Sequence, residues 1–381
     1  MKEIEKERQM IREAATKTAQ KIIQPRAAEI DATGEFPWDL VEALGKQGFL
    51  SFLLPEEYGG MNGDITSFCS VVEEIAKVCG SSSLLLITQG IGTMPILLGG
   101  NPSQKERYFT QISEKNSLTA FTLNESEAGS DAILIKTRAQ KEGKNYLLNG
   151  RKCFITNGSI AHLYAVFAST HPKKGIDGIS AFVVEGETSG LHFGKKEEKI
   201  GMRGSVMTDV IFEDCRIPQE NRLGEEGKGW KMAMETLNRS RPAMGAQAVG
   251  IAQGALDYAI RYANERIQFK KPIASFQAIQ FMIADMATQT EAARALVYQA
   301  AAHIDAHLEE AEKLSAMAKL YASDIAMRVT TDAVQILGGY GYMRDYPVER
   351  MMRDAKVTQV FEGPNQRQRL MVAHHLFGGD E

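Results

Sequence analysis

The stretch "KNYLLNGRKCFITNGS", residues 144–159, decides the fold class, because it interrupts a chain whose two ends have helical character. It contains two short apolar runs joined by Asn149-Gly150. An Asn-Gly pair between two such runs is the strongest short-range signal for a β-hairpin. The stretch therefore predicts a hairpin with its turn at Asn149-Gly150, inside a domain made of β-strands.

More strand-like segments follow the predicted hairpin. The runs "LYAVFAS" (163–169), "GISAFVVE" (178–185) and "MTDVIFED" (207–214) are separated by turn-forming residues. Several short strands with turns between them are typical of a closed or sandwiched β domain. The glycine-rich segment "LGEEGKGW" (223–230) ends this pattern. We therefore predict a middle β-barrel domain over residues 118–226.

Helical periodicity precedes the β domain. Residues 1–31 and the run "SFCSVVEEIAKVCG" (67–80) have apolar side chains at helical spacing, and Gly80 is placed to cap the second helix. These patterns predict an N-terminal all-α domain over residues 1–117.

Helical periodicity also follows the β domain. One face of a predicted helix carries, four residues apart, Tyr321, Ile325, Val329, Ala333 and Leu337. Gly338-Gly339 is a typical helix end. We predict a C-terminal four-helix bundle over residues 227–381, and the whole chain is then an α+β multidomain protein. This order argues against a nicotinamide-type dinucleotide domain, which needs alternating βαβ units.

Composition excludes several classes of protein. The net charge is only −4 and no long basic block occurs, so nucleic-acid binding has little support. The four cysteines have no paired spacing, which gives no indication of a zinc site or a disulfide framework. The first ten residues are rich in charged side chains, and the apolar segment 81–100 is broken by glycines and Pro95, so we expect neither a signal peptide nor a membrane span. The expectation is a cytoplasmic protein without a metal.

Five stretches, in this order, resemble the acyl-CoA dehydrogenase family. They are "TLNESEAGSD" (122–131), "KCFITNGS" (152–159), "ERIQFKKPIASFQ" (265–277), "QILGGYGYMRDYPVERMMRDAK" (335–356) and "FEGPNQRQR" (361–369). The resemblance covers essentially the whole chain. It implies the same three domains, bound FAD, a homotetramer built as a dimer of dimers, and an electron-transferring flavoprotein as the partner that accepts electrons from the enzyme.

The resemblance also implies a reaction and a base. Acyl-CoA dehydrogenases remove hydrogens from Cα and Cβ of an acyl thioester, and Glu362 occupies the position of their catalytic glutamate. A positioned carboxylate can take the weakly acidic α-proton if the developing enolate oxygen is held by hydrogen bonds. The alternative is that Glu362 only favours the start of a helix at Pro364, with Gly363 as its N-cap. In some acyl-CoA dehydrogenases the base lies on the first long helix of the C-terminal domain. That position corresponds to about Ser240 in this sequence, and serine has no carboxylate.

One group of candidate residues belongs to the flavin site of the same subunit. The resemblance assigns to it Phe121, Leu123, Asn124, Ser130, Phe154, Ile155, Thr156 and Gln366. Asn124 replaces the usual Thr, Phe154 replaces the usual Trp, and Pro364 replaces a hydroxyl residue that normally touches the flavin. The alternatives are an ordinary turn at 128–131 and a Phe154 that is plain strand core.

A second group is assigned by the resemblance to the FAD of a neighbouring subunit. Its members are Arg266, Phe269, Gln277, Gln335, Gly338 and Gly339. An arginine fork suits the oxygens of the FAD pyrophosphate. The alternative for Arg266 is a solvated position on a helix, where Lys270 would be a like charge four residues later.

For the substrate, the resemblance assigns Ser130, Asn238, Arg241, Phe361 and Gly363. The alternative for Asn238 and Arg241 is that they only solvate the start of a helix. The predicted acyl pocket borders residues 84–98, which contain no charged side chain. A neutral acyl group therefore suits it better than a dicarboxylyl group, and Gly90 and Gly92 either widen it for a branched or cyclic chain or kink the helix.

The sequence thus predicts an FAD-dependent acyl-CoA dehydrogenase for a neutral short, branched or cyclic acyl-CoA. Three alternatives remain: an enoyl-CoA reductase on the same scaffold, an oxidase that passes electrons to O2, and a relative that binds CoA or flavin without catalysis.

Overall fold

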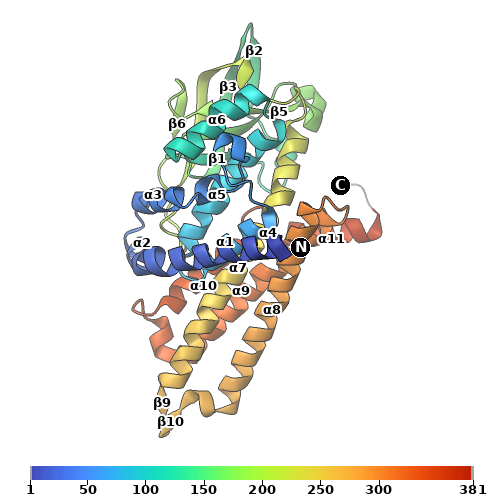
Figure 1. Cartoon of the computed structure of the whole chain (residues 1–381). Coiled ribbons are helices and arrows are strands. Elements are labelled where there is room, and N and C mark those ends of the chain that lie inside the picture. Colours follow the sequence, from blue (N-terminus) through green and yellow to red (C-terminus); the bar gives the residue numbers. More distant parts are fainter. Residues whose placement is uncertain (1, 379–381) are drawn as a thin grey trace.

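The computed structural model describes residues 2–378, and it divides into a helical part, a β part and a second helical part in chain order. In Figure 1 the β part lies at the top, the first helices wrap around the middle, and the long C-terminal helices extend downward. The predicted fold class is confirmed. The domain boundaries at 117/118 and 226/227 remain predictions.

The N-terminal part consists of six α-helices. They are α1 (Lys2–Thr18), α2 (Ala27–Thr33), α3 (Trp38–Lys46), α4 (Ile65–Ala76), α5 (Gly80–Gly99) and α6 (Pro102–Lys115). Asn101 caps α6 through a reciprocal capping box with Gln104, and Pro102 occupies the first helical position. The prediction for Gly80 is wrong: α4 ends at Ala76, and Gly80 begins α5, where a Cβ would lie 2.8 Å from the Asp354 carboxylate.

Helix α5 is the most apolar helix in the described part of the chain. It is long and apolar enough to cross a membrane, but 78% of its apolar window is buried inside the protein, as in the core helix of a soluble fold. Gly92 lets the helix approach strand β1, because a Cβ there would lie 2.4 Å from the Thr119 hydroxyl. Close packing on the β domain therefore explains Gly92 without a wider acyl pocket.

The β part is one eight-stranded sheet. Its strands are β1 (Thr119–Thr122), β2 (Arg138–Glu142), β3 (Asn145–Thr156), β4 (Leu163–Ser169), β5 (Ile179–Glu185), β6 (Leu191–Phe193), β7 (Met207–Pro218) and β8 (Arg222–Leu223). The order is β6-β7-β3-β2-β4-β5-β8, with β1 paired in parallel to β4. Buried aromatic and branched side chains on facing strands, such as Tyr146 and Phe182, form its own core.

The predicted hairpin turn at Asn149-Gly150 is wrong. Strand β3 runs straight through both residues, and the pairing of β3 with β7 shifts register between Leu148 and Gly150. At this shift the Asn149 side-chain amide donates to the Asp214 carboxylate, and the Asn149 side-chain oxygen accepts from the Asp214 backbone N–H. A Cβ at Gly150 would lie 2.4 Å from the Thr137 hydroxyl. The real turn between β2 and β3 contains Gly143, at φ +60°. The Asn-Gly pair therefore marks a β-bulge.

The C-terminal part is a helical bundle. Its helices are α7 (Gly229–Glu265), α8 (Gln277–Asp305), α9 (Ala311–Leu337), α10 (Pro347–Thr358) and α11 (Asn365–Phe377). A short hairpin, β9 (Ile267–Gln268) and β10 (Lys271–Pro272), joins α7 to α8. The predicted end of α9 is confirmed, since Gly338 follows it at φ +61°. Of the predicted apolar face, only Tyr321 is exposed.

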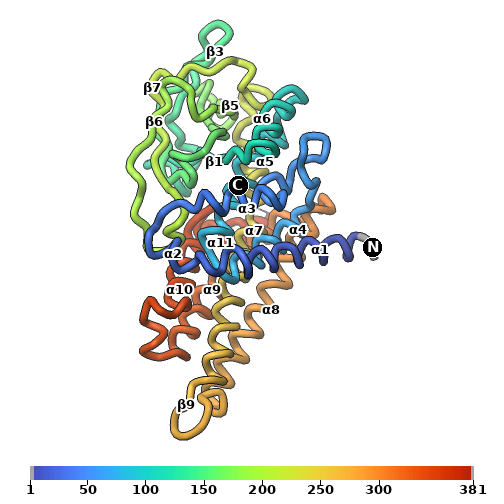
Figure 2. Tube along the Cα trace, turned by 60° about the vertical axis from the view of Figure 1, so that its left-hand side comes forward, coloured from blue at the N-terminus to red at the C-terminus, as the bar shows by residue number. Residues whose placement is uncertain are grey.

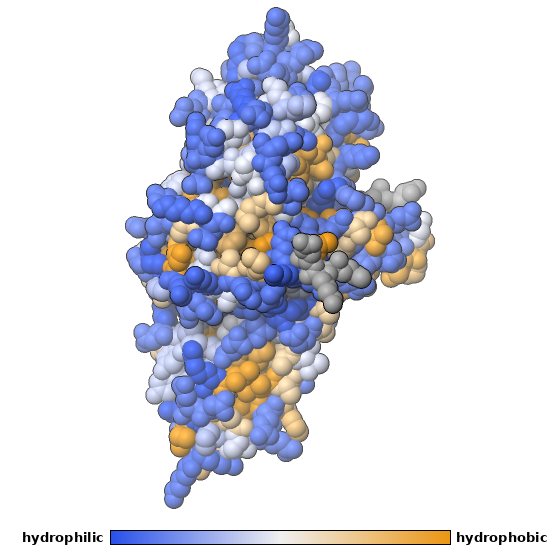
Figure 3. Space-filling view, in the orientation of Figure 1, coloured by the Kyte–Doolittle hydropathy of each residue, from blue (hydrophilic) through white to orange (hydrophobic). Residues whose placement is uncertain are grey.

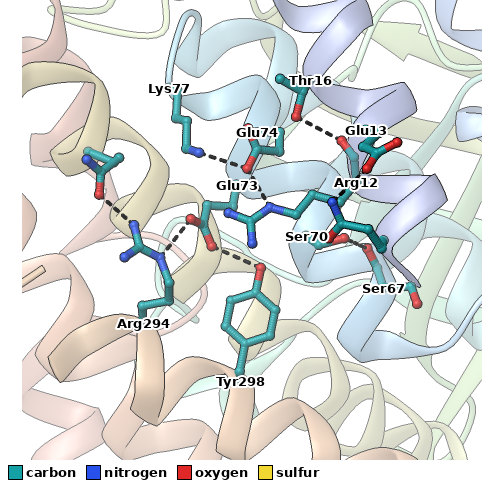
Figure 4. A network of polar contacts seen from close by, with 12 residues as sticks. Arg12, Glu13, Thr16, Ser67, Ser70, Glu73, Glu74, Lys77, Arg294 and Tyr298 are labelled. Carbon is teal, nitrogen blue, oxygen red and sulfur yellow. Dashed lines mark hydrogen bonds and ion pairs between the residues drawn. The ribbon is translucent and has the colours of Figure 1, made fainter. Parts of the chain in front are cut away.

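A polar network ties the first helices to the bundle (Figure 4). Glu73 on α4 is buried, accepts a hydrogen bond of 2.9 Å from the Tyr298 hydroxyl and forms an ion pair of 2.9 Å with Arg294, both on α8. The neighbouring Glu74 pairs with Arg12 of α1 at 2.9 Å. Buried charges are stable when paired in this way, so α1, α4 and α8 are fixed relative to one another.

Candidate active site

Glu362 lies in the tight turn between α10 and α11, and its backbone is left-handed at φ +53°. Gly363 follows at φ +86°. A left-handed glutamate is strained and persists only where its surroundings hold it. Helix α11 begins at Asn365 with Pro364 as its N-cap, so the prediction that Gly363 would be the N-cap is wrong. Glu362 therefore lies three residues before the helix, in a turn with its own supports.

Side chains from α9 and α11 hold this turn. The Lys319 ammonium on α9 donates to the Gly363 carbonyl oxygen at 2.9 Å and to the Asn365 side-chain oxygen at 2.9 Å. The Gln368 amide donates to the carbonyl oxygens of Glu362 and Gly363, at 3.2 and 3.1 Å. The two carbonyls are thus fixed from two directions, and Phe361 packs beside them against the main core.

The surroundings of Glu362 suit a base. Burial raises the pKa of the Glu362 carboxyl to about 7, against the positive charges of Arg241 and Lys319. A carboxyl group with a pKa near neutral pH is an effective general base. The other acid near the alternative base position, Glu235, is paired with Arg239 at 2.6 Å, and Ser240 has no carboxylate. The geometry therefore favours Glu362 over α7 as the source of the base.

Two stretches assigned to the flavin converge beside this turn. The backbone N–H of Cys153 in β3 donates to the Asn124 carbonyl oxygen at 2.9 Å, which places residues 122–131 against the strand end at Phe154. Arg367 of α11 donates to the Ser130 carbonyl oxygen at 3.2 Å. Segments 122–131, 152–156 and 362–367 therefore meet, although they are far apart in the sequence.

Within this meeting point the predicted residues differ in exposure. Phe154 is 65% exposed and left-handed at φ +58°, so the alternative that it is core is wrong. Leu123 and Ile155 are buried, Phe121 and Thr156 are half-buried, and the remaining members of the group, Asn124, Ser130 and Gln366, are exposed. An exposed aromatic ring next to accessible polar groups is a surface on which a planar ring can stack.

Asn238 and Arg241 lie within α7, well past its start at Gly229, so the alternative that they solvate a helix start is wrong. Arg241 is 3% exposed, and its guanidinium donates to the Asn238 side-chain oxygen. The Asn238 amide in turn donates to Glu312 at 2.8 Å. The pair places a fixed positive charge near Glu362.

The second group of flavin-assigned residues lies elsewhere. A hollow of about 520 Å³ is lined by Arg266, Gly338 and Gly339, and the Arg266 guanidinium lies 5.2 Å from the centre of the Tyr340 ring. No atom lies within 4 Å of a Cβ built at Gly338 or Gly339, so backbone borders open space there. Arg266 follows the last residue of α7, so the alternative of a solvated position on a helix is wrong.

The rest of this group lies near the hollow without lining it. Phe269 is 86% exposed at the tip of the β9–β10 hairpin, where Phe269 and Lys270 are both left-handed. Gln277 begins α8, and Gln335 is exposed one turn before Gly338. In Figures 1 and 2 the hairpin lies at the opposite end of the molecule from the β sheet. The hairpin end of the bundle is therefore separate from the Glu362 turn between α10 and α11.

Three residues of the site were missed in the sequence. Lys319, Arg367 and Gln368 all contact the Glu362 turn or the loop beside it. Only Lys319 had a readable signal, because it lies four residues from Ser315 and from Ser323 in a stripe of small residues. A lysine is almost never fully buried unless it is paired, so its place in such a stripe stands out. Among the described residues, no group of three or more His, Cys, Asp or Glu is placed to hold a metal ion.

Three family models match consecutive parts of the chain. They describe the acyl-CoA dehydrogenase N-terminal domain over residues 5–116, the middle domain over residues 120–215 and the C-terminal domain over residues 227–377. The chain belongs to the acyl-CoA dehydrogenase family. It is therefore an oxidoreductase, and the resemblance found in the sequence is confirmed.

Individual acyl-CoA dehydrogenases match along nearly the whole chain. A cyclohex-1-ene-1-carbonyl-CoA dehydrogenase of Syntrophus aciditrophicus is 49% identical over 377 residues, which cover 99% of this chain and 91% of the relative. The structure of butyryl-CoA dehydrogenase from Megasphaera elsdenii superposes with a TM-score of 0.95 at 43% identity, covering 97% of this chain and 98% of that one.

Two further solved structures concern the cofactor and a partner. A chain from a structure described as the electron transferring flavoprotein of Acidaminococcus fermentans has a TM-score of 0.95 at 47% identity and covers 97% of both chains. An acyl-CoA dehydrogenase from Bacillus anthracis complexed with FAD has a TM-score of 0.92 at 33% identity, and covers 98% of this chain and 67% of that one.

Proposed function

We propose that this acyl-CoA dehydrogenase oxidises a neutral short, branched or cyclic acyl-CoA to the 2-enoyl-CoA, with Glu362 as the base that takes the α-proton. The observation that carries the proposal is Glu362 itself: its backbone is left-handed and held by hydrogen bonds, and the pKa of its carboxyl group is raised to about 7. A glutamate that only favoured the start of a helix would need neither a strained backbone nor a raised pKa. The paired state of Glu235 supports the same assignment.

FAD is the cofactor, and the residues present fit it. Phe154 has an exposed ring beside segment 122–131. The hollow at Arg266 is lined by this guanidinium and by Gly338 and Gly339, whose backbone borders open space. Such a hollow suits phosphate or adenine groups. When bound, FAD supplies the acceptor for the hydride that leaves Cβ. Glu362 removes the α-proton, and Arg241 places a positive charge beside the carboxylate.

The substrate assignment rests on charge. Helix α5 has no charged residue between Leu84 and Leu98, so a second carboxylate on the acyl group would find no cation there. The relative from Syntrophus acts on a cyclic acyl-CoA, as its name states, and the relative from Megasphaera on butyryl-CoA. We assign this chain to neutral acyl groups of that size range.

We propose a homotetramer, a dimer of dimers, because the hollow at Arg266 lies at the hairpin end of the bundle, away from the flavin-assigned group beside the Glu362 turn. A second copy has to supply Arg266 and its hollow to the site beside Glu362. Figure 3 shows apolar side chains gathered on the lower half of the bundle, over the region where α7 and α8 run in Figure 1. Phe281 on α8 is 60% exposed and Ile260 on α7 is 37% exposed, which is consistent with a covered interface.

We propose an electron-transferring flavoprotein as the electron acceptor and the cytoplasm as the location. The proposed oxidation of acyl-CoA is tested by incubating the purified protein with an artificial one-electron acceptor and either butyryl-CoA or cyclohexane-1-carbonyl-CoA. The expected product is the 2-enoyl-CoA, identified by mass spectrometry as the loss of two hydrogens. Hydrogen peroxide formed in air without any acceptor would instead identify an oxidase.

A further inference from the structure

Lys319 has no role in the proposed chemistry, yet it is almost fully buried. It is 1% exposed, within the core face of α9. Both groups that accept its hydrogen bonds, the Gly363 carbonyl and the Asn365 side-chain oxygen, are neutral. Burying an ammonium group on neutral acceptors is unfavourable, and an apolar side chain of similar volume would pack there at less cost. A lysine at this buried position therefore needs a reason beyond packing.

The contacts of Lys319 converge on the backbone of the catalytic turn. Its partner Asn365 is itself fixed, because the Asn365 amide donates to the Ser323 hydroxyl at 2.8 Å and to Asp324 at 2.8 Å. The ammonium thus fastens the turn to α9 at two points, one directly at the residue after Glu362. A left-handed glutamate followed by a left-handed glycine requires such external support.

We propose that Lys319 is a positioning residue for Glu362: it clamps the turn to α9, aims the carboxylate at the substrate and favours its ionised form. The inference rests on the proposed role of Glu362 as the base. Lys319 does not itself touch the reacting atoms in this account. It acts through the Gly363 carbonyl and through its positive charge.

The electrostatic part of the proposal has a defined sign. Glu362 and Lys319 act on each other electrostatically. Arg241 from α7 acts on both of them, and Asp324 from α9 acts on Lys319. The charges of Arg241 and Lys319 both lower the pKa of Glu362 against the effect of burial. Burial lowers the pKa of Lys319 itself to about 7, so its ammonium is charged on the acidic side of neutral pH. Removal of this charge therefore raises the pKa of Glu362, and the acidic limb of kcat/KM moves to higher pH.

The test compares Lys319→Met, which removes charge and hydrogen bonds, with Lys319→Gln, which keeps a donor without the charge. Thr330→Val is the matched control, since Thr330 is also fully buried on α9 and its hydroxyl bonds only within that helix. We expect both Lys319 variants to bind FAD and to shift the acidic limb of the kcat/KM profile to higher pH. The fold decrease in kcat should be larger than the fold increase in KM. The loss for Lys319→Met is about 10- to 100-fold, the effect of a slightly misplaced reacting group.

A second measurement does not depend on activity. In a crystal structure of Lys319→Met, or of Lys319→Gln if only that variant folds, we expect Glu362 to leave its left-handed conformation or to become disordered. An unchanged turn together with a wild-type pH profile would overturn the proposal. If the wild type reacts with no acyl-CoA, the proposed function fails, and the crystal structure still decides whether Lys319 holds the turn.

Discussion

At the residue scale, the proposed chemistry depends on how one carboxyl group is placed. Glu362 combines a strained backbone, two carbonyls held by Lys319 and Gln368, and a pKa raised by burial. The sequence motif around Glu362 predicted the residue and its chemistry. The motif could not predict which side chains hold the turn, because Lys319 comes from α9 and Gln368 from the helix after the turn. Hydrogen bonds from side chains to backbone carbonyl oxygens leave no spacing pattern in a sequence.

The raised pKa predicts the pH dependence of the reaction. Glu362 has to be ionised to take a proton, and its pKa is about 7 in the free protein. The value of kcat/KM should therefore fall about tenfold for each pH unit well below 7 and level off above it. Initial rates with a saturating electron acceptor between pH 5 and 9 measure this. A flat profile down to pH 5 would mean that the base has an ordinary carboxyl pKa.

At the scale of elements, residues 144–159 show what a local pattern can and cannot predict. It correctly indicated β structure, because it contains two short runs of aromatic and branched side chains. The turn was misplaced, because an Asn-Gly pair can serve a bulge as well as a hairpin, and the choice depends on β7. The bulge is visible only in the pairing of β3 with β7, where the register shifts at Asn149 and Asn149 bonds to Asp214, 65 residues later.

The bulge makes a prediction about stability. Gly150→Ala should lower the free energy of unfolding by about 1–3 kcal/mol more than Gly143→Ala, because the new Cβ at 150 would overlap Thr137. Gly143 also has a positive φ but no atom within 4 Å of its Cβ position, so it is the control for backbone strain alone. Urea unfolding of both variants measures the difference. Equal losses would show that strand β3 relaxes around the methyl group.

At the scale of the whole molecule, the proposed cofactor site has two parts, one beside the Glu362 turn and one at the hairpin end of the bundle. The order of domains could be predicted, because each domain has its own hydrophobic periodicity. The separation of Arg266 from Glu362 could not be predicted, because it depends on the length and direction of α7. The separation makes the second copy of the chain part of the proposed active site.

The shared site predicts that Arg266→Ala weakens FAD binding. Loss of a charged hydrogen bond to a phosphate costs about 1.5–3 kcal/mol, which corresponds to a roughly 10- to 100-fold higher dissociation constant for FAD. Arg261→Ala is the control, since Arg261 also stacks on a tyrosine, 4.6 Å from the Tyr258 ring centre, but outside the hollow. Flavin content after dialysis and equilibrium titration measure both. Wild-type affinity in Arg266→Ala would remove the basis for the shared site.

The most direct test of Glu362 as the base is an anaerobic titration of the FAD-loaded protein with neutral acyl-CoAs, monitored by the absorbance of oxidised flavin. The wild type should lose this absorbance with at least one short, branched or cyclic acyl-CoA. Glu362→Gln, which keeps the size of the side chain, should bind FAD normally and show a rate of absorbance loss at least about 100-fold lower. Equal loss of absorbance in both proteins would contradict the account.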